Sequence, residues 1–424
     1  MAPANDEHIV TSSAQGSISH NDDKDSNHPS ELSSKVSNEQ LKEKFHSDKA
    51  NAIRQACSDR DIEALASHAT GEGGLLEDEL RRIAWPILLR CDGGMQDDDH
   101  LKPSGDLPRH PDEEQVHLDV NRAFVYYPND LSNQAIAEKK VQLSDLITKI
   151  LRNYPMLCYF QGYHDIVQVF LLVLGNQEAA LAMAHVSLFR IRDYMLRTLS
   201  PAVKHLQLIP AIIEAVDPTL RQHLANIQPF FALAATLTLY AHDIQEYSDI
   251  ARLYDLLLAR EPVVSIYLFA AIILHRKKEL MDIPLDEPEM LHFTLSKLPQ
   301  PLDLDGHILH AEKLFKDHPP ESLPSGIWKS ISRYSVLKTS RNYLSRGCTV
   351  QEAMRLFEQQ DRQLRNEERR RQLVEIVWKN RRTMTSIAVA VLIGAVSFYI
   401  RKKGLDTSIW ACFRQAKAFV SAFV

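Results

Sequence analysis

The polar residues best suited to chemistry gather in two short stretches, "VHLDVNRAFVYYP" at 116–128 and "LCYFQGYHDIVQ" at 157–168. In the first, Val116, Asp119 and Arg122 recur at three-residue intervals, which places them on one face of a helix. Asp119 is therefore expected to hold Arg122 through a carboxylate–guanidinium contact. The second stretch crowds polar side chains at the entrance of a long apolar run. Such an entrance fits either a metal site or a polar surface offered to a partner.

The metal hypothesis depends on two His-Asp pairs, His164-Asp165 and His242-Asp243. Helical phosphohydrolases use such a pair, with further ligands, to hold a divalent metal that activates water. Neighbouring ligands do not share a helix face, so outside partners such as His117 or His185 would be needed. This alternative stays open on the residues alone.

Composition and motifs exclude several other classes of function. The formal net charge of −6 leaves no broad basic excess for a general nucleic-acid binder. The five cysteines are far apart and form no CxxC pair, which argues against a zinc motif or a disulfide framework. A nucleophile elbow, a phosphate-cradling loop and a Gly-rich dinucleotide motif are all absent from the sequence. No phosphate chemistry is therefore expected from this chain alone.

Apolar spacing predicts an all-α fold. From about Ser37 to about residue 346, apolar residues recur at three- and four-residue spacing, with breaks where Pro and Gly cluster. Thr349 and Glu352 form a predicted capping box that opens a long charged helix. We interpret that helix as a solvated spacer because its apolar stripe is ragged.

The C-terminal part of the sequence resembles a membrane anchor. Residues 384–400, "MTSIAVAVLIGAVSFYI", contain no charge, and basic residues flank them on both sides. At about 1.5 Å per residue the segment reaches roughly 25 Å, which suits a thin bilayer such as that of the endoplasmic reticulum. Since residues 1–30 contain no apolar core for a secretory signal, we expect a tail anchor with the bulk of the chain in the cytosol.

Four blocks, taken in order, resemble the TBC domain of Rab GTPase-activating proteins. They are "RRIAWPILL" with Arg82, Trp85, Leu88 and Leu89; Val116-x-x-Asp119-x-x-Arg122; Tyr159-x-Gln161-Gly162; and Arg252-Leu253-Tyr254-Asp255. Tyrosine stands in the last block where the family commonly has tryptophan, and Val116 stands in place of the usual isoleucine. The resemblance implies a multi-helix TBC domain, followed here by the charged helix and a C-terminal transmembrane helix.

The resemblance also implies a mechanism in which the chain supplies catalytic side chains to a partner. Arg122 matches the arginine finger and Gln161 the glutamine finger, both acting in trans on a GTP-bound Rab. Asp119, Tyr159, Gly162 and Asp165 match supporting positions, and Asp165 with His164 is expected to close the loop or cap the helix start. No cofactor of its own is implied, because the Rab carries the GTP and magnesium.

Several segments resemble the branch of the family that is anchored in the endoplasmic reticulum and acts on the Rab of endoplasmic-reticulum-to-Golgi traffic. The partners expected are thus a Rab and membrane lipid, with no nucleic acid. An inactive membrane-anchored Rab-binding tether remains an alternative, and the metal-dependent phosphohydrolase a lesser one. The expected organisation is a disordered segment (1–36), a helical lead-in (37–71), the TBC domain (72–346), the charged spacer (349–382), the anchor (384–400) and a short amphipathic tail (401–424).

Overall fold

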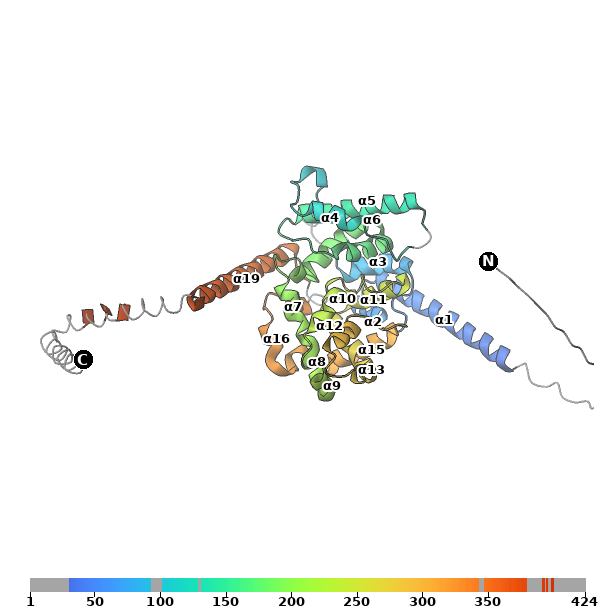
Figure 1. Cartoon of the computed structure of the whole chain (residues 1–424). Coiled ribbons are helices and arrows are strands. Elements are labelled where there is room, and N and C mark those ends of the chain that lie inside the picture. The colour runs from blue at the N-terminus through green and yellow to red at the C-terminus, as the bar shows by residue number, and fades with distance from the viewer. Residues whose placement is uncertain are drawn as a thin grey trace, which may run out of the picture. The chain divides into compact units, whose positions relative to one another are not determined.

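The computed structural model describes residues 30–92, 101–128, 131–342 and 347–379, with the pairs 391–392, 394–395 and 398–399 (Figure 1). Every regular element in these residues is a helix, which confirms the all-α prediction. The chain divides into two compact units, Met1–Ala52 and Ile53–Val424. The first described helix, α1 (Ser30–Ser58), begins inside the segment that was predicted to be disordered up to residue 36.

The α-helices that follow α1 belong to the second unit. They are α2 (Ile62–Thr70), α3 (Asp78–Leu88), α4 (Glu113–Val120), α5 (Asn133–Asn153), α6 (Tyr163–Phe189), α7 (Ser200–Leu206), α8 (Leu208–Val216), α9 (Pro218–His223), α10 (Leu233–Leu237), α11 (Tyr247–Ala259), α12 (Val264–His275), α13 (Lys277–Met281), α14 (Pro288–Leu295), α15 (Leu304–Asp317), α16 (Ile327–Ser330), α17 (Val336–Thr339) and α19 (Val350–Lys379). Short 3₁₀ turns connect several of them: η2 (Ser104–Asp106), η3 (Arg192–Tyr194), η4 (Pro229–Ala232), η5 (Pro320–Ser322), η6 (Pro324–Gly326) and η7 (Ser340–Asn342).

Helix α6 forms the centre of the core. Its apolar run is buried almost throughout, and it packs against α3 and α5. The helix kinks at Gly175, where φ is +77°. Just before the kink, the Arg82 guanidinium donates a hydrogen bond to the Val173 carbonyl at 2.9 Å. Arg82 is therefore a structural residue that ties α3 to the kink of α6.

The same helix α6 is long and apolar enough to cross a membrane, and it is the one such helix among the described residues. Within its most apolar window, 67% of the residues are buried inside the protein, as in a core helix. The anchor predicted at 384–400 lies outside the described residues except for three helical pairs. In those pairs Val391, Leu392, Phe398 and Tyr399 are exposed.

A buried carboxylate joins two of the blocks that the sequence singled out. Asp255 on α11 is fully buried and accepts hydrogen bonds from the Arg81 guanidinium at 3.1 Å and from Trp85 Nε1 at 2.8 Å, both on α3. It also accepts the backbone N–H of Leu75 at 2.9 Å. A buried charge is tolerated only when it is paired and hydrogen-bonded, so this cluster clamps α3 to α11. The residues of these two blocks that meet at Asp255 are thus structural.

The last long helix, α19, begins where the capping box predicts. Its first turn follows Thr349, whose hydroxyl accepts the backbone N–H of Glu352 at 3.2 Å. This hydrogen bond satisfies one of the free amides at the helix start.

The first half of α19 differs from the solvated spacer that we expected. Ala353, Phe357 and Gln360 are buried against the helices of the compact domain, whereas Leu373 and Trp378 farther along are exposed. An ion pair of 3.4 Å joins Lys204 on α7 to α19. The compact domain therefore extends past residue 346, because the apolar positions at the start of α19 have a surface to cover.

Candidate functional site

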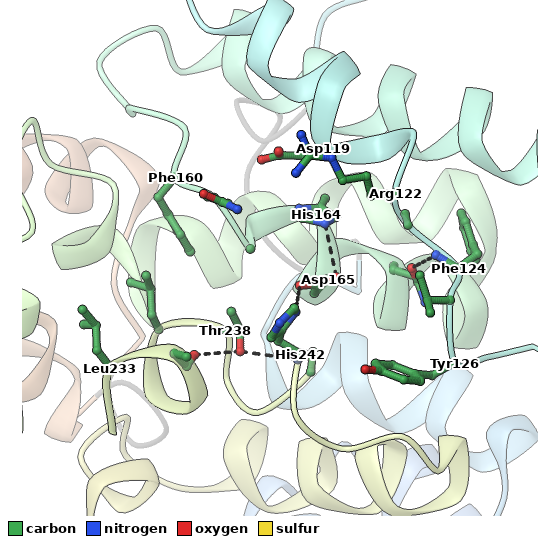
Figure 2. A pocket seen from close by; sticks show the side chains of 18 of the residues that line it. Asp119, Arg122, Phe124, Tyr126, Phe160, His164, Asp165, Leu233, Thr238 and His242 are labelled. Atoms are coloured by element: carbon green, nitrogen blue, oxygen red, sulfur yellow. Dashed lines mark hydrogen bonds and ion pairs between the residues drawn. The ribbon is translucent and has the colours of Figure 1, made fainter. Parts of the chain in front are cut away.

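A cavity of about 640 Å³ opens at the mouth of α6, and we call it the finger pocket (Figure 2). Its walls come from three segments that are distant in sequence, 119–127 at the end of α4, 160–168 at the start of α6 and 230–242 around α10, together with Leu199. The two stretches that the sequence singled out thus line one cavity. The third wall was not predicted as part of the site.

Arg122 lies at the edge of the finger pocket and is exposed. Helix α4 ends at Val120, so Arg122 follows it in a turn, where its backbone N–H donates to the Asp119 carbonyl at 2.9 Å. Its guanidinium makes no hydrogen bond or ion pair with any residue that the structure describes. The side chain is therefore available to a partner.

The predicted contact between Asp119 and Arg122 is wrong. The buried Asp119 carboxylate instead accepts the Tyr159 hydroxyl at 3.0 Å and the Gln115 amide at 3.0 Å. No hydrogen bond or ion pair joins the two side chains among the described residues, and Arg122 follows α4, which ends at Val120. Asp119 instead fixes the end of α4 to the 157–162 loop.

Gln161 is exposed and lines the same cavity. The next residue, Gly162, has φ of +101° and stands directly before the first residue of α6. A Cβ at Gly162 would lie 2.5 Å from Thr238 Cγ2. Glycine is required here for both reasons, because L side chains rarely adopt this φ and the loop passes close to the third wall.

Asp165 receives both histidines of the two His-Asp pairs. Its Oδ1 lies 3.3 Å from His164 Nε2, and its Oδ2 lies 3.2 Å from His242 Nδ1 (Figure 2). The start of α6 has no side-chain cap hydrogen bond, so of the two roles predicted for Asp165, closing the loop or capping the helix start, the capping role is wrong. Its role is to link the start of α6 to the loop after α10.

His164 extends this link to the arginine side of the pocket. Its Nδ1 lies 3.2 Å from the Tyr159 hydroxyl, which in turn donates to Asp119. Burial and the nearby Asp119 raise the pKa of Tyr159, so its hydroxyl stays protonated and able to donate. Burial lowers the pKa of His164, which keeps the ring neutral near pH 7 with one N–H for its two contacts. A row of polar contacts thus links His242 to Asp119 through Asp165, His164 and Tyr159.

Two residues of the site were not predicted. His242 appeared in the sequence only as a possible metal ligand, yet it is exposed in the finger pocket, and its hydrogen bond to Asp165 raises its pKa. Gln168 is buried and accepts the Phe124 backbone N–H at 2.9 Å while donating to the Tyr127 carbonyl at 3.3 Å. It holds the segment after Arg122 in place, and its polar character inside an apolar run was the only signal.

Exposed apolar side chains border the finger pocket. Their exposed fractions range from 37% to 72%, and they are Leu199, Tyr126, Phe230 and Val125. Large apolar residues gathered around an exposed cation and amide are typical of a protein-docking surface.

The metal hypothesis finds no ligand set in the part of the chain that the structure describes, where no three His, Cys, Asp or Glu residues are grouped to hold an ion. His117, one of the outside ligands considered, lies instead 3.2 Å from the Ser144 hydroxyl. His185 is buried in the core and contacts the Leu89 carbonyl at 3.0 Å. The two His-Asp pairs meet through hydrogen bonds at Asp165.

Several known proteins are similar to this chain. A family model described as the Rab-GTPase-TBC domain matches residues 78–281, inside the range predicted for that domain. The GTPase-activating protein gyp10 of Schizosaccharomyces pombe is 36% identical over 307 residues, which cover 70% of this chain and 80% of gyp10. TBC1 domain family member 20 of Homo sapiens is 35% identical over 265 residues, or 62% of this chain and 65% of that protein. Among solved structures, the Ypt/Rab-GAP domain of Gyp1p aligns with a TM-score of 0.48 at 14% identity, covering 62% of this chain and 98% of that domain.

The family match covers the helices that build the finger pocket, from α3 to α13. The match to gyp10 extends over most of both proteins. The predicted resemblance is thereby confirmed, and the chain belongs to the Rab-GTPase-TBC domain family.

Proposed function

We propose that this chain accelerates GTP hydrolysis by a GTP-bound Rab, with Arg122 and Gln161 as catalytic residues supplied in trans. The observation that carries the proposal is that both side chains are exposed on one cavity. A Rab holding GTP and magnesium hydrolyses slowly, because charge that builds on the phosphate oxygens is poorly stabilised and the attacking water is loosely held.

Each finger supplies what the slow reaction lacks. The Arg122 guanidinium brings delocalised positive charge and several donors to the developing charge. The Gln161 amide both donates and accepts, as orienting a water requires. Neither group changes covalently, so the chemistry is that of the GTP held by the Rab.

The supporting residues make the two fingers rigid. Asp119 and Tyr159 fix the end of α4 to the loop that carries Gln161. Gly162 lets that loop approach the third wall, and Asp165 binds the loop after α10. Positioning groups in advance lowers the barrier because less ordering remains for the transition state.

The substrate that we propose is the Rab of endoplasmic-reticulum-to-Golgi traffic, with the chain anchored in the endoplasmic reticulum membrane and its TBC domain in the cytosol. The absence of charge in residues 384–400 supports the anchor. The exposed apolar side chains of Val391, Leu392, Phe398 and Tyr399 support it too, because such residues need a lipid or protein cover.

Single-turnover GTP hydrolysis tests the function. The full chain in detergent is added to a panel of GTP-loaded Rabs, beside Arg122→Ala and Gln161→Ala. Strong stimulation of one or two Rabs, lost in both variants, would support the proposal and identify the substrate. Binding of GTP-loaded Rab without stimulation by the unmodified chain would favour the tether instead.

A further inference from the structure

A second cavity, of about 720 Å³, lies between α19 and the segment 329–338, and we call it the basic groove. It shares no lining residue with the finger pocket. Its volume falls within the range of ligand-binding clefts, which is about 300–1,000 Å³.

Two rows of cationic side chains face the basic groove. On α19, Arg362 and Arg370 carry the charge. The neutral Asn366 lies midway between them, and the four-residue intervals place all three on one face of the helix. The other wall contributes Lys329, Arg333 and Lys338. Five cations thus line the groove, and Glu367 is its one acidic lining residue. In a chain with a net charge of −6, this concentration cannot reflect a generally basic composition.

Most of this positive charge is not neutralised within the protein. Glu367 is already engaged, by Lys204 at 3.4 Å and by the Gln363 amide at 2.7 Å. Arg362 and Arg370 are exposed and form no hydrogen bond or ion pair within the described ranges 30–92, 101–128, 131–342 and 347–379.

The wall opposite α19 is held firmly. Lys338 donates to the Ile331 carbonyl at 2.6 Å and lies 5.3 Å from the centre of the Trp328 ring. Across the groove, the Ser332 hydroxyl donates to the Gln363 amide oxygen at 2.8 Å, which ties this wall to α19. This hydrogen bond holds the wall that carries Lys329, Arg333 and Lys338 to the helix that carries Arg362 and Arg370.

We propose that the basic groove binds a compact polyanion carrying several phosphate groups, such as a phosphorylated inositol ring. Guanidinium groups match phosphate oxygens in a bidentate manner, and two facing rows suit a ligand with phosphates on both sides. A continuous acidic protein segment fits less well, because the cations surround a cavity and do not form a single stripe.

The phosphorylated ring has two possible sources, a free inositol polyphosphate and a lipid head group. Helix α19, which forms one wall of the groove, is followed in the sequence by the predicted anchor, so a lipid head group is one candidate. The chemistry of recognition is the same for both sources.

Titration calorimetry of the full chain in detergent, with inositol hexakisphosphate as the probe, tests the proposal. We expect saturable binding to one site, weakened about 100-fold in the double variant Arg362→Gln with Arg370→Gln, because each charge-assisted hydrogen bond to phosphate contributes about tenfold in affinity. The matched control is Arg371→Gln with Lys379→Gln, which removes the same charge from exposed positions of the same helix that do not line the groove and do not share the face of Arg362. Should the double variant fold poorly by circular dichroism, each single substitution is measured alone, with about a tenfold weaker affinity expected.

Three results would overturn the proposal: no saturable binding of the probe, an equal loss of affinity in both double variants, or binding of polyglutamate but not of the probe. The source of the ligand is separated by phosphatidylcholine vesicles with and without phosphatidylinositol bisphosphate. Tighter binding to the phosphorylated vesicles than to the free probe supports a head group, and the reverse supports a soluble ligand. The binding assay contains no Rab, so its outcome is independent of the proposed GTPase activation.

Discussion

The finger pocket and the basic groove are cavities of similar volume, about 640 and 720 Å³, and both present arginine to the solvent. They differ in what stands behind the arginine. Arg122 follows a helix end that Asp119, Tyr159 and His164 fasten through a chain of hydrogen bonds. Arg362 and Arg370 stand on the exposed face of a helix among other cations.

This difference separates two uses of positive charge. A single cation on a rigid base can meet charge that develops at one point, which is what stabilising a transition state requires. Several exposed cations around an open groove attract an anion without fixing one atom, and their effect falls with ionic strength. Substitutions in the finger pocket should therefore have large and local effects, whereas those in the groove should have graded ones.

The largest effect is expected for Arg122→Ala. The stimulated rate should fall by about 10³- to 10⁵-fold, the range found for an arginine finger, when measured by single-turnover hydrolysis with saturating Rab. Thermal stability should not change, because Arg122 is exposed and its side chain forms no hydrogen bond or ion pair with the described residues. Arg369→Ala, an exposed residue of α19 that does not line the finger pocket, is the control. A rate loss of less than tenfold would show that Arg122 only binds the partner.

A smaller loss is expected for Gly162→Ala, because the added Cβ would meet Thr238 and φ is +101°. A shift of about 1 Å in Gln161 should slow stimulation by about 100-fold. Gly175→Ala is the matched control, since it also has positive φ, at +77°, but no atom within 4 Å of the new Cβ. It should cost about 1–3 kcal/mol in the free energy of unfolding and leave stimulation intact. Equal losses of stimulated rate in Gly162→Ala and Gly175→Ala would contradict the role of the 157–162 loop in positioning Gln161.

His242→Ala should lower stimulation about fivefold, since a net hydrogen bond contributes about 1 kcal/mol. His242→Asn should restore most of it, because the Asn amide can replace Nδ1–H as a donor to Asp165. His242→Gln, whose amide extends toward the Nε2 position, should not. Recovery in the Gln variant alone would instead indicate a direct contact between His242 and the Rab.

The pH dependence of stimulation gives a further test of the same hydrogen bond. The hydrogen bond to Asp165 raises the pKa of His242, with Asp243 acting in the same direction, Lys297 opposing, and His164 nearby. The ion pair is therefore complete below the unfolded value of about 6.5 and is lost as pH rises through the higher folded pKa. Stimulation by the unmodified chain should decline over that window, and His242→Ala should flatten the profile. Matching profiles for the two proteins would contradict the role of the hydrogen bond.

The smallest effect concerns salt. With saturating Rab, raising the ionic strength should change the rate set by the finger pocket by less than about twofold, because its supporting chain is largely buried. Binding of a polyphosphate in the basic groove should weaken by about tenfold or more over the same range. An equal dependence on ionic strength of the stimulated rate and of polyphosphate binding would contradict the proposed difference between the two cavities.

Much of the fold could be predicted because it depends on local patterns. Three- and four-residue apolar spacing predicted the all-α architecture, and Thr349 predicted the start of α19. The paired motifs also indicated Arg122 and Gln161, whose exposure on one cavity is consistent with that prediction.

Contacts between segments that are distant in the sequence could not be predicted from such local patterns. Asp119 and Arg122 have the spacing of an ion pair, yet the helix ends at Val120 and a tyrosine from another segment takes the carboxylate. The burial of the first half of α19 likewise depended on the surface that it meets. Sequence spacing does not show which of several possible hydrogen-bond partners a polar side chain contacts in the folded protein.

The sequence by itself determined the helical elements, the apolar core positions and the choice of Arg122 and Gln161 as candidate fingers, because each depends on short-range spacing or on a motif. Only the tertiary structure decided that His242 meets Asp165, and that α19 and the segment 329–338 enclose a basic groove. The physical reason is that a hydrogen bond or a cavity wall depends on distance in space, which the packing of the helices sets.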